Sequence, residues 1–374
     1  MSKHPTIRLK PREGRRLRAG APWAFSNEIA MSAPAKALKP GSVVNVEGDD
    51  GHALGTGYFN PNSLIAIRLL DARPDIVPDA EFFASRLGAA RALRDAVYRE
   101  PYYRLVHAEG DFLPGLTIDR FGDTYVVQIT TAGMEALREK LLKALGAEHV
   151  VLRADTPSRA LEGLASYVEG DASRVAVQEN GIRYFADLAG GQKTGWYYDQ
   201  RDNRAFMAGL ASGKSVLDAY CHTGGFALAA AKAGAREVVA VDSSAPALAL
   251  AEESAAANAL RCQFVKADVF EELERLGAAK ESFDLVIADP PPFVKSRKDL
   301  EPGAKAYRKL ARLSARVTAP GGLLFLASCS HNIPLERFAS ECAAGIQRAD
   351  RRARLIRTAG AGPDHPVHPM LPET

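Results

Sequence analysis

The stretch SVLDAYCHTGGF, residues 215–226, decides the fold. It reads as a short apolar strand that ends at Asp218, followed by a turn through Gly224 and Gly225 into a helix. Glycine lets the backbone approach a ligand closely, and the N–H groups at the start of a helix favour a nucleotide-like ligand. The stretch has neither the GxGxxG of dinucleotide enzymes nor the GxxxxGK[ST] phosphate loop, so nicotinamide and ATP are disfavoured.

The same alternation of strand and helix continues along the C-terminal half of the chain. After the strand at 216–218, further strands are expected at 238–241, 263–265, 285–288 and 323–327. Near-continuous apolar strands separated by helices are typical of an α/β fold whose parallel sheet is covered on both faces. Such a sheet binds its ligand at the carboxyl ends of the strands.

Acidic residues stand at the ends of these strands. Asp242 ends the second strand, at a position where a carboxylate can hold a ribose diol. Asp268 ends the third, where it can meet the amino group of an adenine or cap the following helix. With Asp218, the pattern predicts a site for an adenosine-containing ligand at this edge.

The fourth and fifth strands end in residues suited to a planar base and to nucleophilic attack. The loop Asp289-Pro290-Pro291-Pro292-Phe293 is rigid because proline fixes its own φ. In it, Asp289 can hydrogen-bond the edge of a heterocycle and Phe293 offers a stacking face. The fifth strand leads to Cys329, a thiol that is either a nucleophile aimed into the crevice or a small core residue.

The N-terminal half shows two other patterns, so the expected domains are 1–75, 76–185 and 186–374. Short β-type runs punctuated by glycine and proline predict a small β barrel over the first of these ranges, and mixed strands and helices predict an α+β unit over the second. Four aromatic residues of the barrel can stack on bases or belong to its core: Trp23, Phe25, Tyr58 and Phe59.

A basic segment opens the chain. Between Lys3 and Arg18 there are seven basic residues and one acid, on a protein whose formal net charge is only +3. The segment favours a polyanion such as nucleic acid, although a solvated basic face is the commoner explanation of a charge run.

Composition excludes several classes of protein. The chain has 374 residues, of which 47% are hydrophobic and 25% charged, as in ordinary globular proteins. The sequence contains no run of about 18 uninterrupted apolar residues, so no membrane span is predicted. The four cysteines have no CxxC spacing, so neither a zinc site nor a disulfide framework is expected. This cysteine usage favours a reducing, cytoplasmic location.

Several motifs occur together in this chain. They are GGQKTGWYYDQR at 190–201, the stretch 218–226, Asp242, Asp268, the loop 289–293, SCS at 328–330 and DHPV at 364–367. In combination they resemble the class I S-adenosylmethionine-dependent RNA methyltransferases, specifically the bacterial ribosomal large-subunit RNA cytosine-5 methyltransferase I family. The resemblance covers essentially the whole chain. It implies a PUA-type RNA-binding barrel, a central α+β domain and a Rossmann-like methyltransferase domain.

The resemblance also implies roles for individual residues. The Cys329 thiolate would attack carbon 6 of cytosine, and Asp289 would bind the base edge. The residues implied in holding S-adenosylmethionine are Asp218, Tyr220, Gly224, Phe226, Asp242 and Asp268, with Lys193 and Thr194 closing over the methionine end. The residues expected to contact large-subunit ribosomal RNA are Pro290, Pro291 and Phe293 in the loop, and Arg12, Arg15 and Arg16 near the N-terminus. Arg201 and Arg204 are further candidates for phosphate contacts, and a homodimer is a possible assembly.

Two departures from the family pattern leave alternatives open. Many cytosine-5 RNA enzymes carry a second cysteine beside the proline of the fourth-strand loop, and this loop has none. The chain also stops at Thr374, where a late antiparallel hairpin is expected to continue. Methylation of an amino group on adenine or guanine, a ribosome-assembly factor without turnover, and a small-molecule methyltransferase remain the alternative functions.

Overall fold

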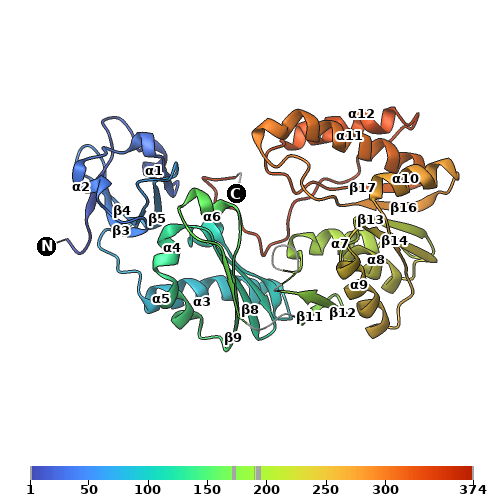
Figure 1. The fold of residues 1–374 in the computed structure, drawn as a ribbon, viewed down its shortest axis with the longest axis horizontal. Coiled ribbons are helices and arrows are strands. Elements are labelled where there is room, and N and C mark those ends of the chain that lie inside the picture. The colour runs from blue at the N-terminus through green and yellow to red at the C-terminus, as the bar shows by residue number, and fades with distance from the viewer. Residues whose placement is uncertain (1, 171–173, 189, 191–194, 373–374) are drawn as a thin grey trace. The chain divides into compact units, whose positions relative to one another are not determined.

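The computed structural model describes residues 2–170, 174–188, 190 and 195–372 (Figure 1). The chain forms two compact units that are not continuous in sequence. Unit 1 contains Met1–Val175, Asp187–Asp199 and Ala361–Thr374, and unit 2 contains Ala176–Ala186 and Gln200–Gly360. No helix in the described part is long and apolar enough to cross a membrane.

Unit 2 is built on a five-stranded sheet. Its strands are β13 (Ser215–Ala219), β14 (Glu237–Asp242), β15 (Gln263–Lys266), β16 (Phe283–Ala288) and β17 (Thr318–Leu326). They lie in the order β15-β14-β13-β16-β17, and every neighbouring pair is parallel. The parallel sheet expected from the sequence is therefore confirmed, and all five carboxyl ends lie along one edge.

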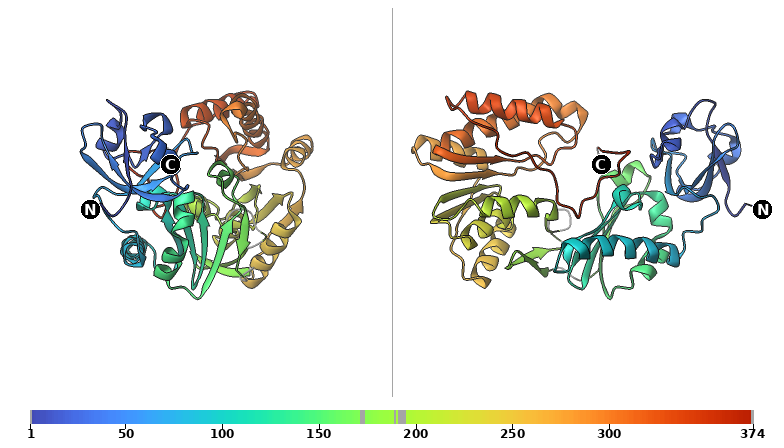
Figure 2. Two further views of the ribbon diagram at one scale, coloured as in Figure 1. Left: turned by 60° about the vertical axis from the view of Figure 1, so that its left-hand side comes forward. Right: turned by 180° about the vertical axis from the view of Figure 1, so that it is seen from behind.

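Helices cover both faces of this sheet (Figures 1 and 2). Alternate strand residues point to opposite faces because successive side chains of a strand do so. Leu217, Val239 and Val286 pack with one set of helices, and Val216, Val238 and Leu285 pack with the other. The first set is α10 (Val269–Ala278) and α11 (Leu300–Val317), and the second is α7 (Arg201–Ala208), α8 (Gly225–Lys232) and α9 (Ala245–Ala257). Helix α12 (Leu335–Gln347) packs along α11.

A hairpin completes unit 2. It consists of β11 (Arg174–Glu179) and β12 (Ile182–Asp187). The Tyr184 hydroxyl on β12 donates a hydrogen bond to the carbonyl of Gly225, 3.3 Å away, at the start of α8. The hairpin thus contacts the helix that follows the first strand of the sheet.

Unit 1 begins with a small five-stranded sheet in the order β1-β3-β4-β5-β2. Its elements are β1 (Thr6–Arg8), α1 (Arg15–Arg18), β2 (Trp23–Ala24), α2 (Ala33–Lys36), β3 (Ser42–Glu47), β4 (Ala53–Phe59) and β5 (Ile67–Asp71). Tyr58 and Phe59 are buried, so of the four aromatic candidates for base stacking these two are core residues. Trp23 and Phe25 are only half-buried.

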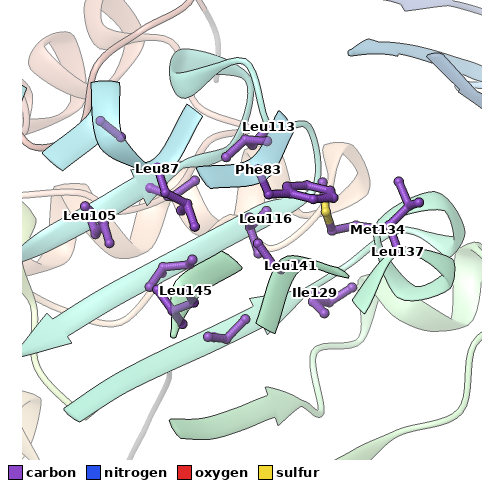
Figure 3. Packing of buried hydrophobic residues seen from close by; sticks show 14 of the residues in the cluster. Phe83, Leu87, Leu105, Leu113, Leu116, Ile129, Met134, Leu137, Leu141 and Leu145 are labelled. Atoms are coloured by element: carbon purple, nitrogen blue, oxygen red, sulfur yellow. The ribbon is translucent and has the colours of Figure 1, made fainter. Parts of the chain in front are cut away.

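The second sheet of unit 1 has the order β10-β9-β8-β7-β6. Its elements are α3 (Ala80–Val97), β6 (Tyr102–His107), β7 (Leu116–Phe121), β8 (Thr124–Ile129), α4 (Ala132–Ala136), α5 (Arg138–Leu145), β9 (His149–Ala154), α6 (Ser158–Leu161) and β10 (Tyr167–Glu169). Figure 3 shows its core, where Phe83 and Leu87 of α3 face Leu116 and Ile129 of the sheet and Leu141 of α5.

A buried ion pair ties the end of the chain into this unit. Arg94 is 1% exposed, and its guanidinium donates to both carboxylate oxygens of Asp111 at 2.5 and 2.7 Å. The same guanidinium donates to the carbonyl of Asp364 at 2.9 Å. The Asp364 carboxylate in turn accepts from the backbone N–H of Arg104 at 3.0 Å. The DHPV motif is therefore part of the structure of unit 1.

Replacing Arg94 by methionine is expected to destabilise unit 1. The change leaves the buried Asp111 carboxylate without its guanidinium, and the loss of one partner of a buried ion pair costs about 3 to 5 kcal/mol. Thermal unfolding followed by circular dichroism checks this, with Arg99→Met as the control because Arg99 is exposed. Equal melting temperatures for the two variants would contradict the expectation.

Candidate functional site

The site is built from the loops at the carboxyl ends of the parallel strands. The register pairs Asp218 of β13 with Ala240 of β14 on one side and Ile287 of β16 on the other. Beyond the strands, the backbone N–H of Asp289 donates to the carbonyl of Ala219 at 3.4 Å. The strand ends that the sequence singled out are therefore neighbours.

Asp218 lies beneath the first of these loops. It is fully buried, and one oxygen, Oδ2, accepts a hydrogen bond from the backbone N–H of Ala227 at 2.8 Å, in the first turn of α8. The other oxygen, Oδ1, has no hydrogen-bond partner among the described residues. Burial, together with the nearby carboxylates of Asp289 and Asp242, raises the pKa of Asp218 to about 7.

The loop from Tyr220 to Gly224 has an unusual backbone. Tyr220, His222 and Gly224 all have positive φ, at 67°, 49° and 81°. A side chain at Gly224 would place its Cβ 2.7 Å from the Cδ1 atom of Leu228, so only glycine fits this position. The backbone N–H of Tyr220 donates to the carbonyl of Val241 at 2.9 Å, which ties the start of this turn to β14.

Asp242 fixes this loop to the second strand. Its two carboxylate oxygens accept hydrogen bonds from the backbone N–H groups of His222 at 2.9 Å and Ser244 at 2.8 Å. The residue is half-buried, and each carboxylate oxygen has a second lone pair for a further donor.

The remaining residues of the expected cofactor set lie in three different environments. Tyr220 is half-buried, and burial raises its pKa. Phe226 is buried and packs on Phe325 of β17, with ring centroids 5.4 Å apart. Asp268 is exposed and caps α10 by accepting from the N–H of Glu271 at 3.1 Å, which is the helix-cap role. Lys193 and Thr194 lie outside the described residues.

Cys329 and the proline loop meet at the fourth and fifth strand ends. The Cys329 thiol is half-buried and donates to the carbonyl of Pro290, with 3.7 Å between sulfur and oxygen. The backbone N–H of Ala327 donates to the carbonyl of Ala288, so β16 and β17 stay paired up to this point. The nucleophile and the base-binding loop predicted separately from the sequence are thus in contact.

Tyr307 on α11 holds the segments on either side of Cys329, and the sequence interpretation did not include it. Its buried hydroxyl accepts from the hydroxyl of Ser328 at 2.8 Å and lies 2.7 Å from that of Ser330. The Phe293 N–H donates to the same hydroxyl at 3.5 Å, and the Val294 N–H donates to Ser330 at 3.2 Å. One tyrosine therefore connects the proline loop with both neighbours of the thiol.

Phe293 is engaged in packing within the protein. Its ring stacks on that of Phe270, with 5.9 Å between the ring centroids, and packs on that of Tyr307, with 4.8 Å between the centroids. The stacking face that the sequence interpretation gave to a base is thus used to support the loop. In the same loop Pro290 is buried and Pro291 is exposed.

The thiols of Cys221, Cys262 and Cys342 are all at least partly shielded from water. Burial raises the pKa of Cys262 and of Cys342 to about 12, and raises that of Cys221 as well. All four cysteines are free thiols. Among the described residues no group of three or more His, Cys, Asp or Glu side chains can hold a metal ion.

The basic candidates divide between the two units. In unit 1, Arg12, Arg15 and Arg16 are exposed, and Arg16 lies over the ring of Phe25 at 5.8 Å. In unit 2, Arg201 and Arg204 are buried beside Glu179, which corrects the expectation of phosphate contacts. Arg204 donates to both oxygens of Glu179, at 2.6 and 2.7 Å.

Comparisons with known proteins identify the family of the chain. Residues 127–347 match the S-adenosylmethionine-dependent methyltransferase family, and residues 7–72 match a PUA-like domain. "Ribosomal RNA large subunit methyltransferase I" of Shewanella frigidimarina is 37% identical over 98% of this chain and 96% of its own. The protein of that name from Photobacterium profundum is 38% identical over 98% of this chain and 95% of its own.

Solved structures share the fold. A Streptococcus mutans protein described as a SAM-dependent methyltransferase superposes with a TM-score of 0.80 at 22% identity, covering 98% of this chain and 96% of its own. The fold and the match of residues 127–347 place the chain in the class of S-adenosylmethionine-dependent methyltransferases. Within that class, the chain belongs to the family of proteins named ribosomal RNA large subunit methyltransferase I.

The residues present fit S-adenosylmethionine. Within the described residues the buried Oδ1 of Asp218 has no hydrogen-bond partner, and Gly224 ends the loop without a side chain. Asp242 adds a half-buried carboxylate, which suits a ribose diol, and the acidic edge suits a positively charged sulfonium.

The raised pKa of Asp218 predicts a pH-dependent stability without ligand. In the folded protein the Asp218 carboxyl keeps its proton up to about pH 7, whereas in the unfolded chain it loses the proton near pH 3.8. The contribution of this proton to the free energy of unfolding is therefore complete below pH 3.8 and disappears as the pH rises to 7. The shift corresponds to about 4 kcal/mol. Relative to Asp218→Asn, the wild type should lose free energy of unfolding between about pH 4 and 7 in urea titrations. Parallel pH profiles for the two proteins would contradict the assignment.

Removing the Tyr307 hydroxyl is expected to slow methyl transfer. The Tyr307→Phe change frees both loops, and a displacement near 1 Å at a reacting group costs up to about 100-fold in kcat. The affinity for S-adenosylmethionine and the KM for it should stay near the wild-type values, as measured by calorimetry and steady-state kinetics.

Tyr58→Phe is the matched control. It also removes a buried hydroxyl, one that donates to the carbonyl of Pro114 at 2.8 Å in unit 1. Each variant should lose about 1 kcal/mol of stability. Only Tyr307→Phe should lower kcat, and equal kcat values for the two variants would remove the positioning role.

Proposed function

We propose that this protein methylates carbon 5 of a cytosine in large-subunit ribosomal RNA, through a covalent bond between Cys329 and carbon 6. The observation that carries the proposal is the contact of the Cys329 thiol with the carbonyl of Pro290. It brings a nucleophile to the loop that begins with Asp289. The substrate class is inferred from the names of the relatives, and the exposed basic residues of the PUA-like domain support it.

The chemistry needs a nucleophile because carbon 5 of cytosine is a weak one. Addition of the Cys329 thiolate to carbon 6 forms the S–C6 bond and shifts electron density to carbon 5. S-adenosylmethionine supplies the methyl group on a sulfonium centre. Once carbon 5 carries the methyl group, loss of its proton restores the ring double bond and the thiolate leaves.

Asp289 and the proline loop orient the base in this proposal. In its protonated form the Asp289 carboxyl donates a hydrogen bond to the ring nitrogen, where charge develops when the thiolate adds, and its other oxygen accepts from the amino group. Pro290 and Pro291 keep the loop backbone rigid. The ring of Phe293 holds the loop against the protein by packing on Phe270 and Tyr307.

Cys221 is not the missing second cysteine of the family pattern. It is 5% exposed, and burial raises its pKa, so it stays protonated at neutral pH. Its thiol donates to the carbonyl of His222 at 3.8 Å. Removal of the carbon 5 proton is therefore assigned to another residue or to a water molecule.

RNA contacts in unit 1 are proposed for Arg12, Arg15 and Arg16. All three are exposed, and α1 carries two of them. Arginines at such positions bind phosphates without reading sequence, so they would set affinity rather than the choice of nucleotide.

The test is methyl transfer from labelled S-adenosylmethionine to protein-free large-subunit ribosomal RNA that lacks the modification. Label should appear in 5-methylcytidine after digestion. Cys329→Ala should lower kcat by about 1,000-fold or more, because the nucleophile is absent. Cys262→Ala is the matched control, since it removes another half-buried thiol of unit 2 and should keep its activity.

A trapping experiment tests the covalent step separately. RNA containing 5-fluorocytidine cannot lose a proton from carbon 5, so the adduct should survive denaturing electrophoresis with the wild type and be absent with Cys329→Ala. Label on an amino group that survives Cys329→Ala would replace this mechanism by amino-group methylation. RNA binding without any label would favour an assembly factor.

A further inference from the structure

A groove on the outer surface of unit 2 is lined only by basic side chains. It has a volume of about 660 Å³, and its lining residues are Lys305, Arg308, Lys309, Arg312 and Arg348. The first four lie on α11 at a spacing of three, one and three residues, which places them on one face of the helix. Arg348 follows directly after the last residue of α12.

Acidic neighbours neutralise two of these five cations. Arg308 pairs with Glu341 at 2.5 Å, and Lys309 pairs with Glu274 at 3.1 Å. For Lys305, Arg312 and Arg348, no carboxylate within the described part of the chain lies within 4.0 Å. Three like charges therefore share one groove, and their mutual repulsion opposes folding unless an anion occupies it.

Packing of the helix does not require these cations. The opposite face of α11 carries the buried residues Tyr307, Leu310, Ala311 and Ser314. That face already attaches the helix to the sheet and to the loops around Cys329. The basic face is thus available for a partner.

The groove also connects to the candidate active site. The Lys309 ammonium lies 4.9 Å from the ring of Phe270. Phe270 stacks on Phe293 of the proline loop, and Tyr307 on the same helix binds the loop beyond β17. Helix α11 therefore presents cations on one side and positions catalytic loops on the other.

We infer that this groove binds the phosphate backbone of the RNA substrate. The inference rests on the proposed function. From Lys305 to Arg312 the helix rises about 10 Å, which matches roughly three phosphates along one strand of a duplex. A protein partner would be expected to use apolar anchors, and the lining offers none. The groove extends RNA recognition from the PUA-like domain to the methyltransferase unit.

The test is a triple variant, Lys305→Gln with Arg312→Gln and Arg348→Gln, which keeps both ion pairs of the groove. Binding to protein-free large-subunit ribosomal RNA is measured by filter retention over a range of salt concentrations. The Kd at 0.15 M salt should rise by about tenfold or more, and the salt slope of log K should fall by about 2 to 3. Affinity for S-adenosylmethionine should match the wild type, and without RNA the melting temperature should be equal or higher, because the repulsion between the three cations is removed.

A second triple variant controls for net charge. Lys232→Gln, Arg261→Gln and Lys280→Gln remove three exposed cations elsewhere in unit 2 and should leave the salt slope within about one of the wild type. Equal Kd values and slopes for the two triple variants would overturn the inference. Because binding is measured without turnover, failure to find 5-methylcytidine would overturn the proposed chemistry and leave the groove result standing.

Discussion

The hydroxyl of Tyr307 is the contact on which the arrangement of the candidate active site depends. Parallel pairing of β16 and β17 brings the two strand ends together, but the loops beyond them have no ladder to hold them. Tyr307 supplies that constraint through Ser328, Ser330 and the N–H of Phe293. Because the hydroxyl is buried, its hydrogen bonds are not exchanged with water, and the thiol between the two serines keeps a defined position.

Asp218 shows how the cofactor loop is held at the middle of the same edge, on the strand next to β16. A carboxyl group that is 0% exposed and has one oxygen without a partner in the described part of the chain is costly to bury in its charged form, and its raised pKa reflects that cost. In return, its other oxygen anchors the start of α8 and so fixes the left-handed turn before it. Stability is given up at the place where a ligand is expected to bind, as is common at functional sites.

Much of this site follows from the sequence because parallel strands must end at one edge. Acids and a cysteine that each follow an apolar strand are therefore brought together, as found for Asp218, Asp242 and Cys329. Other features depend on contacts between distant segments and leave no local pattern. Tyr307 reads as an ordinary core aromatic, and the burial of Arg204 depends on Glu179 in a separate hairpin. The basic face of α11, by contrast, could have been found from its helical spacing.

The Arg94–Asp364 contact has a consequence for the order in which the protein is made. The two residues are 270 positions apart, and the whole of unit 2 is encoded between segments of unit 1. At ribosomal speeds of about 5 to 20 residues per second, Arg94 leaves the ribosome roughly 15 to 50 s before Asp364 exists. During that interval nearly all of unit 2 is synthesised, while the sheet of unit 1 waits for its final segment. The segment that completes the first unit of the chain is thus made only after the second unit.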